Sequence, residues 1–233
     1  MNSFADDPDA VPIRPAATVI ALRDGAAGLE VLVVRRDTNL AFHGGSWVFP
    51  GGRVDDHEIS DSDDDMAAAR LAAAREAHEE AGLVVEPSDL IPLSHWTTPW
   101  GRNRRFATWF FVVAAPAGEV VIDDSEIRAY EWHTLDAAIS GSDAGDIQLA
   151  APTYISLRRL RAHQRVTDAL ETTAARPNEI FLPKLVRTDA GLWSVYQDDA
   201  GYESGNLDTP GPRHRTQMLD AGFDYENTVD PPI

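Results

Sequence analysis

The chain contains no cysteine among its 233 residues. Disulfide bonds and metal sites built on thiolates are therefore excluded. A chain without cysteine fits a reducing compartment, and we expect a cytoplasmic protein. No apolar run approaches the roughly 20 residues that a membrane helix needs. The first ten residues, M-N-S-F-A-D-D-P-D-A, also lack the apolar core of a signal peptide.

Positive charge is scarce as well, since 20 lysines and arginines face 38 acidic residues and give a net charge of -18. Such a surface repels phosphate backbones and anionic lipid, so we expect neither a nucleic acid nor a membrane as a partner. A small phosphorylated substrate is compatible with this charge if cations line its pocket. The sequence leaves open whether the protein forms a homodimer.

The pattern of apolar residues predicts an α/β protein. Residues 1–14 are predicted to form a polar tail. After it, short segments rich in apolar residues predict strands at 16–23, 29–36, 46–49, 89–96, 105–114 and 127–133. Helices are predicted at 66–82, 134–139 and 152–163. The sequence D-G-A-A-G predicts a hairpin between the first two strands, and D-A-G predicts another between 184–187 and 193–196. The expected architecture is one α/β domain with a helical and hairpin C-terminal extension.

The predicted helix at 66–82 gathers like charges, because Glu76, Glu79 and Glu80 stand at i, i+3 and i+4. Each such pair costs a few tenths of a kcal/mol. The opposite side of the helical wheel is predicted to face the core and holds Ala67, Leu71, Ala74, His78 and Ala81. An acid among Asp63 to Asp65 should cap the first turn, and Gly82 should end the helix.

Two interpretations of the glutamates remain open on the helix alone. They form either a solvated face, softened by Arg75, or a site for a hard divalent cation such as Mg²⁺ or Mn²⁺. The sequence P-G-G before the helix predicts a tight turn with positive φ. Gly51 and Gly52 lack a β-carbon, so the backbone there could approach a metal or a phosphate closely.

The stretch R-E-A-H-E-E-A-G-L, from Arg75 to Leu83, resembles the second half of the Nudix hydrolase signature at every defined position. That signature is a glycine, five residues, a glutamate, seven residues, then R-E-U-x-E-E-x-G-U with U apolar. Here twenty-two residues separate Gly52 from Arg75 where the signature has thirteen. Counting back from Arg75 places the first glutamate on Ala67. Its supporting role is therefore expected to be vacant, or filled by one of Asp63, Asp64 and Asp65.

The resemblance implies a fold, a reaction and a set of residues. The fold would be an α/β/α sandwich around a mixed sheet over residues 15–165, with residues 166–233 packed on it as an extension. The reaction would be hydrolysis of a nucleoside diphosphate linked to another group. Mg²⁺ or Mn²⁺ would be held by Glu76, Glu79 and Glu80 with the carbonyl of Gly51, while Arg75 would orient a glutamate. The general base would be one of these glutamates or the loop acid Glu126, with Asp123 and Asp124 as rivals.

The insertion and three later stretches, 97–111, 131–138 and 147–160, are similar to the branch of peroxisomal coenzyme A diphosphatase. This similarity implies coenzyme A or acyl-coenzyme A as substrate. The alternatives are ADP-ribose, NADH or dinucleoside polyphosphates, or a Nudix module that binds a nucleotide without cleaving it. The substrate's phosphates would be bound by Gly52, Arg102, Arg104 and Arg105, although the arginines also fit an exposed hairpin tip. Trp96, Trp100 and Trp109 are either adenine-stacking or core residues, and His43 is expected in a loop.

Overall fold

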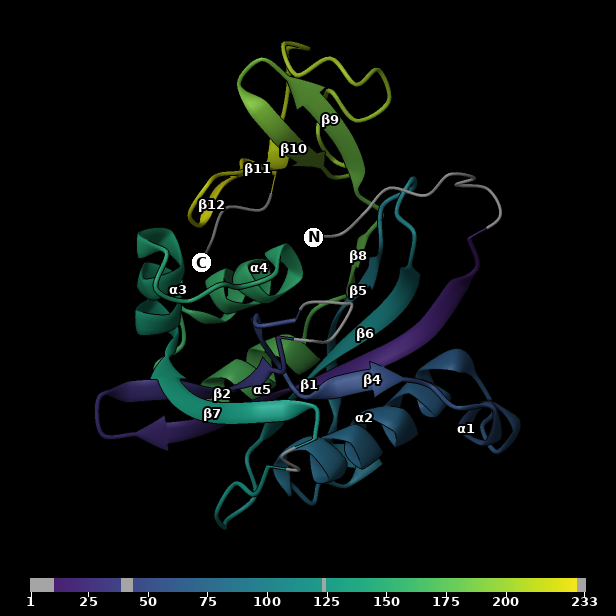
Figure 1. The fold of residues 1–233 in the computed structure, drawn as a ribbon, viewed down its shortest axis with the longest axis vertical. Helices are drawn as coiled ribbons and strands as arrows, with labels where there is room; N and C mark the ends of the chain where they lie inside the picture. Colours follow the sequence, from purple (N-terminus) through teal and green to yellow (C-terminus); the bar gives the residue numbers. More distant parts are fainter. Residues whose placement is uncertain (1–10, 39–43, 123–124, 230–233) are drawn as a thin grey trace.

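The computed structural model describes residues 11–38, 44–122 and 125–229. Its centre is a mixed eight-stranded sheet with the order β3-β2-β1-β6-β5-β8, in which β4 also pairs with β1 and β7 with β2 (Figure 1). These strands are β1 (Ile13–Gly25), β2 (Gly28–Arg36), β3 (Trp47–Val48), β4 (Gly51–Arg53), β5 (Ile91–Thr97), β6 (Arg105–Ala114), β7 (Ile127–Thr134) and β8 (Glu179–Phe181). The β1–β6 and β5–β8 pairs are parallel, so the predicted mixed sheet is confirmed.

The ends of the first hairpin also follow the sequence. Gly25 lies opposite Gly28 in the β1–β2 pair, and Gly28 has a φ of 124° that favours glycine. Strand β1 begins at Ile13, so it takes in the last two residues of the stretch predicted as a tail. Residues 1–10 lie outside the part of the chain that the structure describes.

Alternate residues of the central strands pack on opposite faces of the sheet. Val19 and Ala21 of β1 share a core with helix α2 (Asp65–Ala81). Ile20 and Leu22 share another core with α3 (Leu135–Ala144), α4 (Ala151–Leu160) and α5 (Val166–Ala174). Figure 1 shows α2 on one side of the sheet and α4 on the other. The α/β class with helices on both faces is therefore confirmed.

Helix α2 lies within one residue of its predicted range. Asp64 caps it by accepting a hydrogen bond from the backbone N–H of Ala67 at 2.8 Å. Gly82 ends it with a φ of 67°. The predicted core face is wrong, however, because Leu71 and His78 are exposed. The buried residues of the helix are Ala68, Ala69, Ala72, Ala73, Ala77, Glu80 and Ala81.

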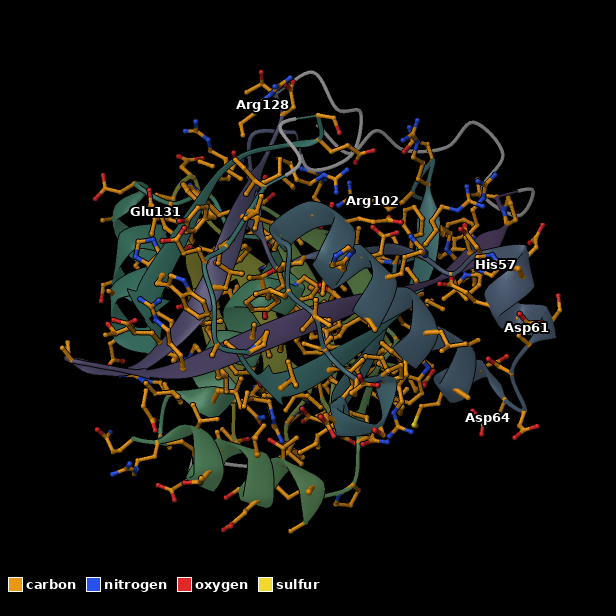
Figure 2. All side chains as sticks on the ribbon, turned by 90° about the horizontal axis from the view of Figure 1, so that it is seen from below. His57, Asp61, Asp64, Arg102, Arg128 and Glu131 are labelled. Carbon is orange, nitrogen blue, oxygen red and sulfur yellow. The ribbon has the colours of Figure 1, made fainter. Side chains whose placement is uncertain are left out.

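The acidic insertion holds a short helix that the sequence analysis did not predict. This helix, α1 (Asp56–Ser60), packs beside α2. The Glu58 carboxylate accepts the backbone N–H of Asp55 at 2.7 Å and is buried. Asp61 and Asp64 lie at the N-terminal end of α2, and Arg102 lies toward its C-terminal end (Figure 2).

A second, antiparallel sheet follows, in the order β12-β11-β10-β9. Its strands are β9 (Lys184–Thr188), β10 (Gly191–Val195), β11 (His214–Met218) and β12 (Phe223–Asn227). The β9–β10 hairpin was predicted, whereas α5, β11 and β12 were not. Strand β11 is polar in sequence, and its buried Arg215 pairs with buried Asp199 at 2.6 Å. In the described ranges, we find no helix with the length and apolarity to cross a membrane.

Candidate active site

The two glycines of β4 lie against strand β1 and helix α2. A β-carbon on Gly51 would stand 2.4 Å from the carbonyl oxygen of Ala17, and one on Gly52 would stand 2.3 Å from Oε1 of Glu76. Neither glycine has a positive φ, so the turn conformation predicted from P-G-G is wrong. Glycine is needed at position 51 because a side chain there would collide with the backbone of β1, whereas a β-carbon at position 52 would displace the carboxylate of Glu76.

Glu80 is buried behind this glycine strand. The backbone N–H of Gly51 donates to its Oε2 at 2.9 Å, and the guanidinium of Arg36 lies 3.6 Å from its Oε1. Burial raises the pKa of Glu80 to about 8 against the opposing effects of these two donors. The carboxylates of Glu76 and Glu126 raise this pKa further. A cation that bound Glu80 would therefore displace a proton from it at neutral pH.

Glu76 is a second carboxyl group with a raised pKa. Burial is the main cause of the rise, and the negative charges of Glu79 and Glu126 add to it. The guanidinium of Arg75, which donates to Oε1 of Glu76 at 2.8 Å, opposes it. Mutual repulsion among these acids is what a bound divalent cation would relieve.

Arg75 binds several groups at once. Its Nε donates to Oε1 of Glu58 at 2.9 Å, and one terminal nitrogen donates to Glu76 at 2.8 Å and to Glu79 at 3.0 Å. The other terminal nitrogen donates to the carbonyl of Arg53 at 3.0 Å. The hydrogen bond with Glu58 is the largest contribution that raises the pKa of Arg75 above its ordinary value. Arg75 thus orients two glutamates of α2 and ties them to α1 and β4.

Glu58 corrects the expectation for the first signature glutamate. The role is neither vacant nor filled by Asp63, Asp64 or Asp65, which are exposed. Instead Glu58, whose side chain is 4% exposed, holds Arg75. The sequence carried this signal, since exactly five residues separate Gly52 from Glu58 when the count runs forward from the glycine. The extra nine residues therefore follow the glutamate rather than precede it.

The glutamates open onto a cleft of ≈ 740 Å³. Among the described residues, the charged ones that line it are Arg36, Arg53, Glu76, Glu79, Glu80, Arg102, Arg104 and Glu126. Four arginines thus stand beside four glutamates in a chain of net charge -18. Arg36 lies between an acid of helix α2 and an acid just before β7, because it is 3.6 Å from Glu80 and 3.1 Å from Glu126. Sequence reasoning missed Arg36 and Arg53, which no motif marks.

Of the three arginines predicted to bind substrate, Arg102 and Arg104 line the cleft. Arg105 is not among the lining residues, and its Nε donates to the carbonyl of Thr98 at 3.2 Å. Desolvation lowers the pKa of Arg102, which is consistent with its partly buried position. Gly52 also lines the cleft, next to Glu76.

Of the tryptophans predicted either to stack on adenine or to lie in the core, one is buried, one is partly buried and one is exposed. Trp96 lines the cleft but is buried and stacks on Phe181. Trp109 stacks on Phe111 in the core beside α2, and Trp100 is 61% exposed. Among these three tryptophans, only Trp96 lines the cleft. The predicted positions His43, Asp123 and Asp124 lie outside the described residues.

The donor set suits Mg²⁺ or Mn²⁺, because hard cations prefer carboxylate oxygens. Within residues 11–38, 44–122 and 125–229, no three acidic or histidine side chains are gathered tightly enough to hold an ion as they stand. Arg75 holds Glu76 and Glu79 in ion pairs. The oxygen donors, the raised pKa values of Glu76 and Glu80, and the close glycine strand nevertheless fit a divalent cation.

The glycines give a prediction that separates folding from function. Gly52→Ala should displace the flexible carboxylate of Glu76 and weaken Mn²⁺ binding about 10- to 100-fold, the usual effect of disturbing a metal site's support. Gly51→Ala should instead lower the thermal midpoint, because its β-carbon meets the backbone of β1. Calorimetric titration and thermal melts in chelator would measure both. Unchanged Mn²⁺ affinity in folded Gly52→Ala would contradict the close packing against Glu76.

Comparison with known proteins agrees with this geometry. A model of the NUDIX domain matches residues 12–153, more than half of the chain. A Nudix hydrolase from Alicyclobacillus acidocaldarius has a similar fold, with a TM-score of 0.65 and 26% identity, and the match covers 72% of this chain and 100% of that one. The chain therefore belongs to the Nudix hydrolase family.

Two curated relatives show how far the similarity extends. The putative 8-oxo-dGTP diphosphatase 3 of Mycobacterium tuberculosis is 25% identical over 201 residues, 76% of this chain and 79% of that protein. Nudix hydrolase 22, chloroplastic, of Arabidopsis thaliana is 37% identical over 91 residues, 38% of this chain. The chain matches only 28% of the length of the Arabidopsis protein, so that similarity is local.

Proposed function

We propose that this protein is a divalent-metal-dependent diphosphatase that cleaves a nucleoside diphosphate linked to another group, with coenzyme A or acyl-coenzyme A as substrate. The observation that carries the reaction is the cleft in which four glutamates face four arginines. A diphosphate is strongly anionic, and in this acidic chain the cleft is a place where cationic side chains gather. We expect Mg²⁺ or Mn²⁺ to be held by Glu76, Glu79 and Glu80, with the carbonyl of Gly51.

Each residue has a role in the proposal. A bound divalent cation would neutralise phosphate charge and lower the pKa of a water molecule. Arg75 keeps Glu76 and Glu79 oriented through the hydrogen bonds described above. Glu126, which Arg36 holds at 3.1 Å, is the proposed general base at the edge of the cleft. A glutamate of α2 is the alternative base.

The choice of coenzyme A is supported by Arg102 and Arg104. Coenzyme A carries a phosphate beyond its diphosphate, and guanidinium groups bind phosphate oxygens in pairs. Both arginines line the same cleft as the glutamates, so one substrate can contact both groups. ADP-ribose and NADH have no phosphate outside the diphosphate, and dinucleoside polyphosphates have none on the 3′ position of the ribose. These compounds are the alternative substrates. The name of the mycobacterial relative adds 8-oxo-dGTP to the compounds worth testing.

A substrate panel tests the proposal. We expect Mn²⁺- or Mg²⁺-dependent cleavage of coenzyme A, with kcat/KM about 10- to 100-fold above that of 3′-dephospho-coenzyme A, the scale of one charged hydrogen bond. Arg104→Ala should remove most of this difference, whereas Arg187→Ala, an exposed arginine of β9, should preserve it. Products would be identified by mass.

Other outcomes select among the alternatives. Cleavage restricted to ADP-ribose, NADH, diadenosine tetraphosphate or 8-oxo-dGTP would retain the metal site and reject coenzyme A. Equal rates for coenzyme A and its dephospho form would reject the role of Arg104. Nucleotide binding without turnover of any compound would favour the non-catalytic module.

A further inference from the structure

The C-terminal sheet of β9–β12 packs against the main sheet beside the cleft. Strand β8, at the edge of the main sheet, pairs with β5, so that Trp96 lies opposite Phe181. Their rings stack with centroids 3.7 Å apart and planes 4° from parallel. Tyr196, next to β10, packs edge-on against both rings at 5.6 Å and 5.2 Å and is buried. Such packing fixes the second sheet relative to the residues of β5 that line the cleft.

Because the second sheet packs here, residues from the C-terminal part of the chain line the cleft. Pro183, Ser194 and Met218 line it, together with Pro152 and Thr153 of α4. None of these side chains is charged, in contrast to the glutamates and arginines of the same cleft. Pro183, Ser194 and Met218 lie beyond residue 153, where the match to the family model ends. We call these three residues the C-terminal wall.

We propose that the C-terminal wall seats the uncharged arm of the substrate, the amide-bearing chain that continues from the diphosphate away from the nucleoside. This inference rests on the proposed function and adds a determinant of specificity to it. An uncharged wall gains little from a phosphate, whereas the apolar side chains of Pro183 and Met218 can pack against methylene and methyl groups, of which a polyol such as a second ribose offers fewer. A chain of methylenes and amides matches this surface.

Within the C-terminal wall, Met218 is the residue that we expect to limit how long a substrate arm can be. Met218 is unbranched and flexible, so its side chain can adapt to chains of different shape. It stands in β11 between Leu192 of β10 and Phe223 of β12, which fixes its backbone. Size at position 218 should therefore determine how far an acyl chain can extend along the wall.

Two substitutions with opposite effects on the size of the side chain at position 218 test this inference. Met218→Trp should narrow the wall and Met218→Ala should widen it, while Leu219→Trp, a neighbour that is 49% exposed and does not line the cleft, serves as the matched control. Binding of hexanoyl-coenzyme A and of adenosine 3′,5′-bisphosphate, which lacks the arm, would be measured by calorimetry with chelator present. We expect Met218→Trp to lower the affinity for hexanoyl-coenzyme A relative to that for adenosine 3′,5′-bisphosphate at least about tenfold, the lower end of the effect of one misfitting methylene. Met218→Ala should shift the preference among acyl-coenzyme A chains toward longer ones.

The outcomes separate this inference from the proposed function. A selective loss of hexanoyl-coenzyme A binding in Met218→Trp would support the wall even if the protein cleaved none of these compounds. Equal weakening of both ligands, no weakening of either, or the same change in Leu219→Trp would overturn it. If Met218→Trp did not fold, an unchanged chain-length preference in Met218→Ala would overturn it instead. Failure to cleave coenzyme A would refute the proposed substrate without deciding these ratios.

Discussion

Replacing Glu79 by glutamine should lower kcat about 10³-fold, the upper scale for removing one preorganised electrostatic group from an active site. The substitution keeps the shape of the side chain and removes its charge. Glu79 is 56% exposed and is held by Arg75 at 3.0 Å, so the folded protein loses one partly exposed ion pair. We therefore expect the free energy of unfolding to change by less than about 1 kcal/mol.

The measurement is the rate of coenzyme A cleavage as a function of Mn²⁺ concentration, with thermal melts alongside. The matched control is Glu86→Gln, which removes an exposed acid shortly after the same helix and does not line the cleft. The control should retain its rate and its Mn²⁺ dependence. A fully active Glu79→Gln protein with unchanged metal dependence would remove Glu79 from the proposed site.

The second large effect is expected at Glu58. Glu58→Ala leaves Arg75 without the partner that contributes most to its raised pKa, and Arg75 is itself only 24% exposed. Removing one member of a buried pair costs about 3–5 kcal/mol, and the partial exposure of Arg75 places the expected loss near the lower figure. Metal affinity should also fall about 10- to 100-fold, because Arg75 orients Glu76 and Glu79.

Denaturant unfolding and Mn²⁺ titration would measure the two effects separately. Glu58→Gln is the conservative comparison, since its amide oxygen can still accept from Arg75, and it should recover part of both losses. Glu58→Ala should weaken metal binding even at temperatures where it is fully folded. A stable variant with normal Mn²⁺ affinity would show that Arg75 positions the glutamates without α1.

Much of the site could be predicted from the sequence because many of its residues lie close together in the chain. The helix with Glu76, Glu79 and Glu80 and the glycines before it form two short motifs. Glu58 was missed because the count ran backward from Arg75 across the insertion. The core face of α2 was missed because alanine occurs on nearly every side of the helix, so apolar spacing gave little contrast. In the structure the small alanines let α2 lie close to the sheet, and this face also buries Glu80.

The rest of the site depends on contacts between residues far apart in the chain. Arg36 and Glu126 meet because β2 pairs with β7, at a sequence separation of 90. The C-terminal wall depends on β8 pairing with β5 and on the polar strand β11, whose sequence does not alternate in the manner of a core strand. No short turn joins the strands of these pairs, so turn geometry does not specify which strands meet or in what register.

The position of the insertion bears on how the signature can tolerate extra length. Glu58 and Arg75 are fixed to each other by hydrogen bonds, so the chain between them must leave α1 and return along α2. Of the sixteen residues between them, ten lie in α2, so most of this segment is hydrogen-bonded helix and not a flexible loop. A longer segment before Glu58 would instead shift this carboxylate relative to Gly52. The signature is therefore defined by which side chains meet, and the spacing between Glu58 and Arg75 can lengthen without separating them.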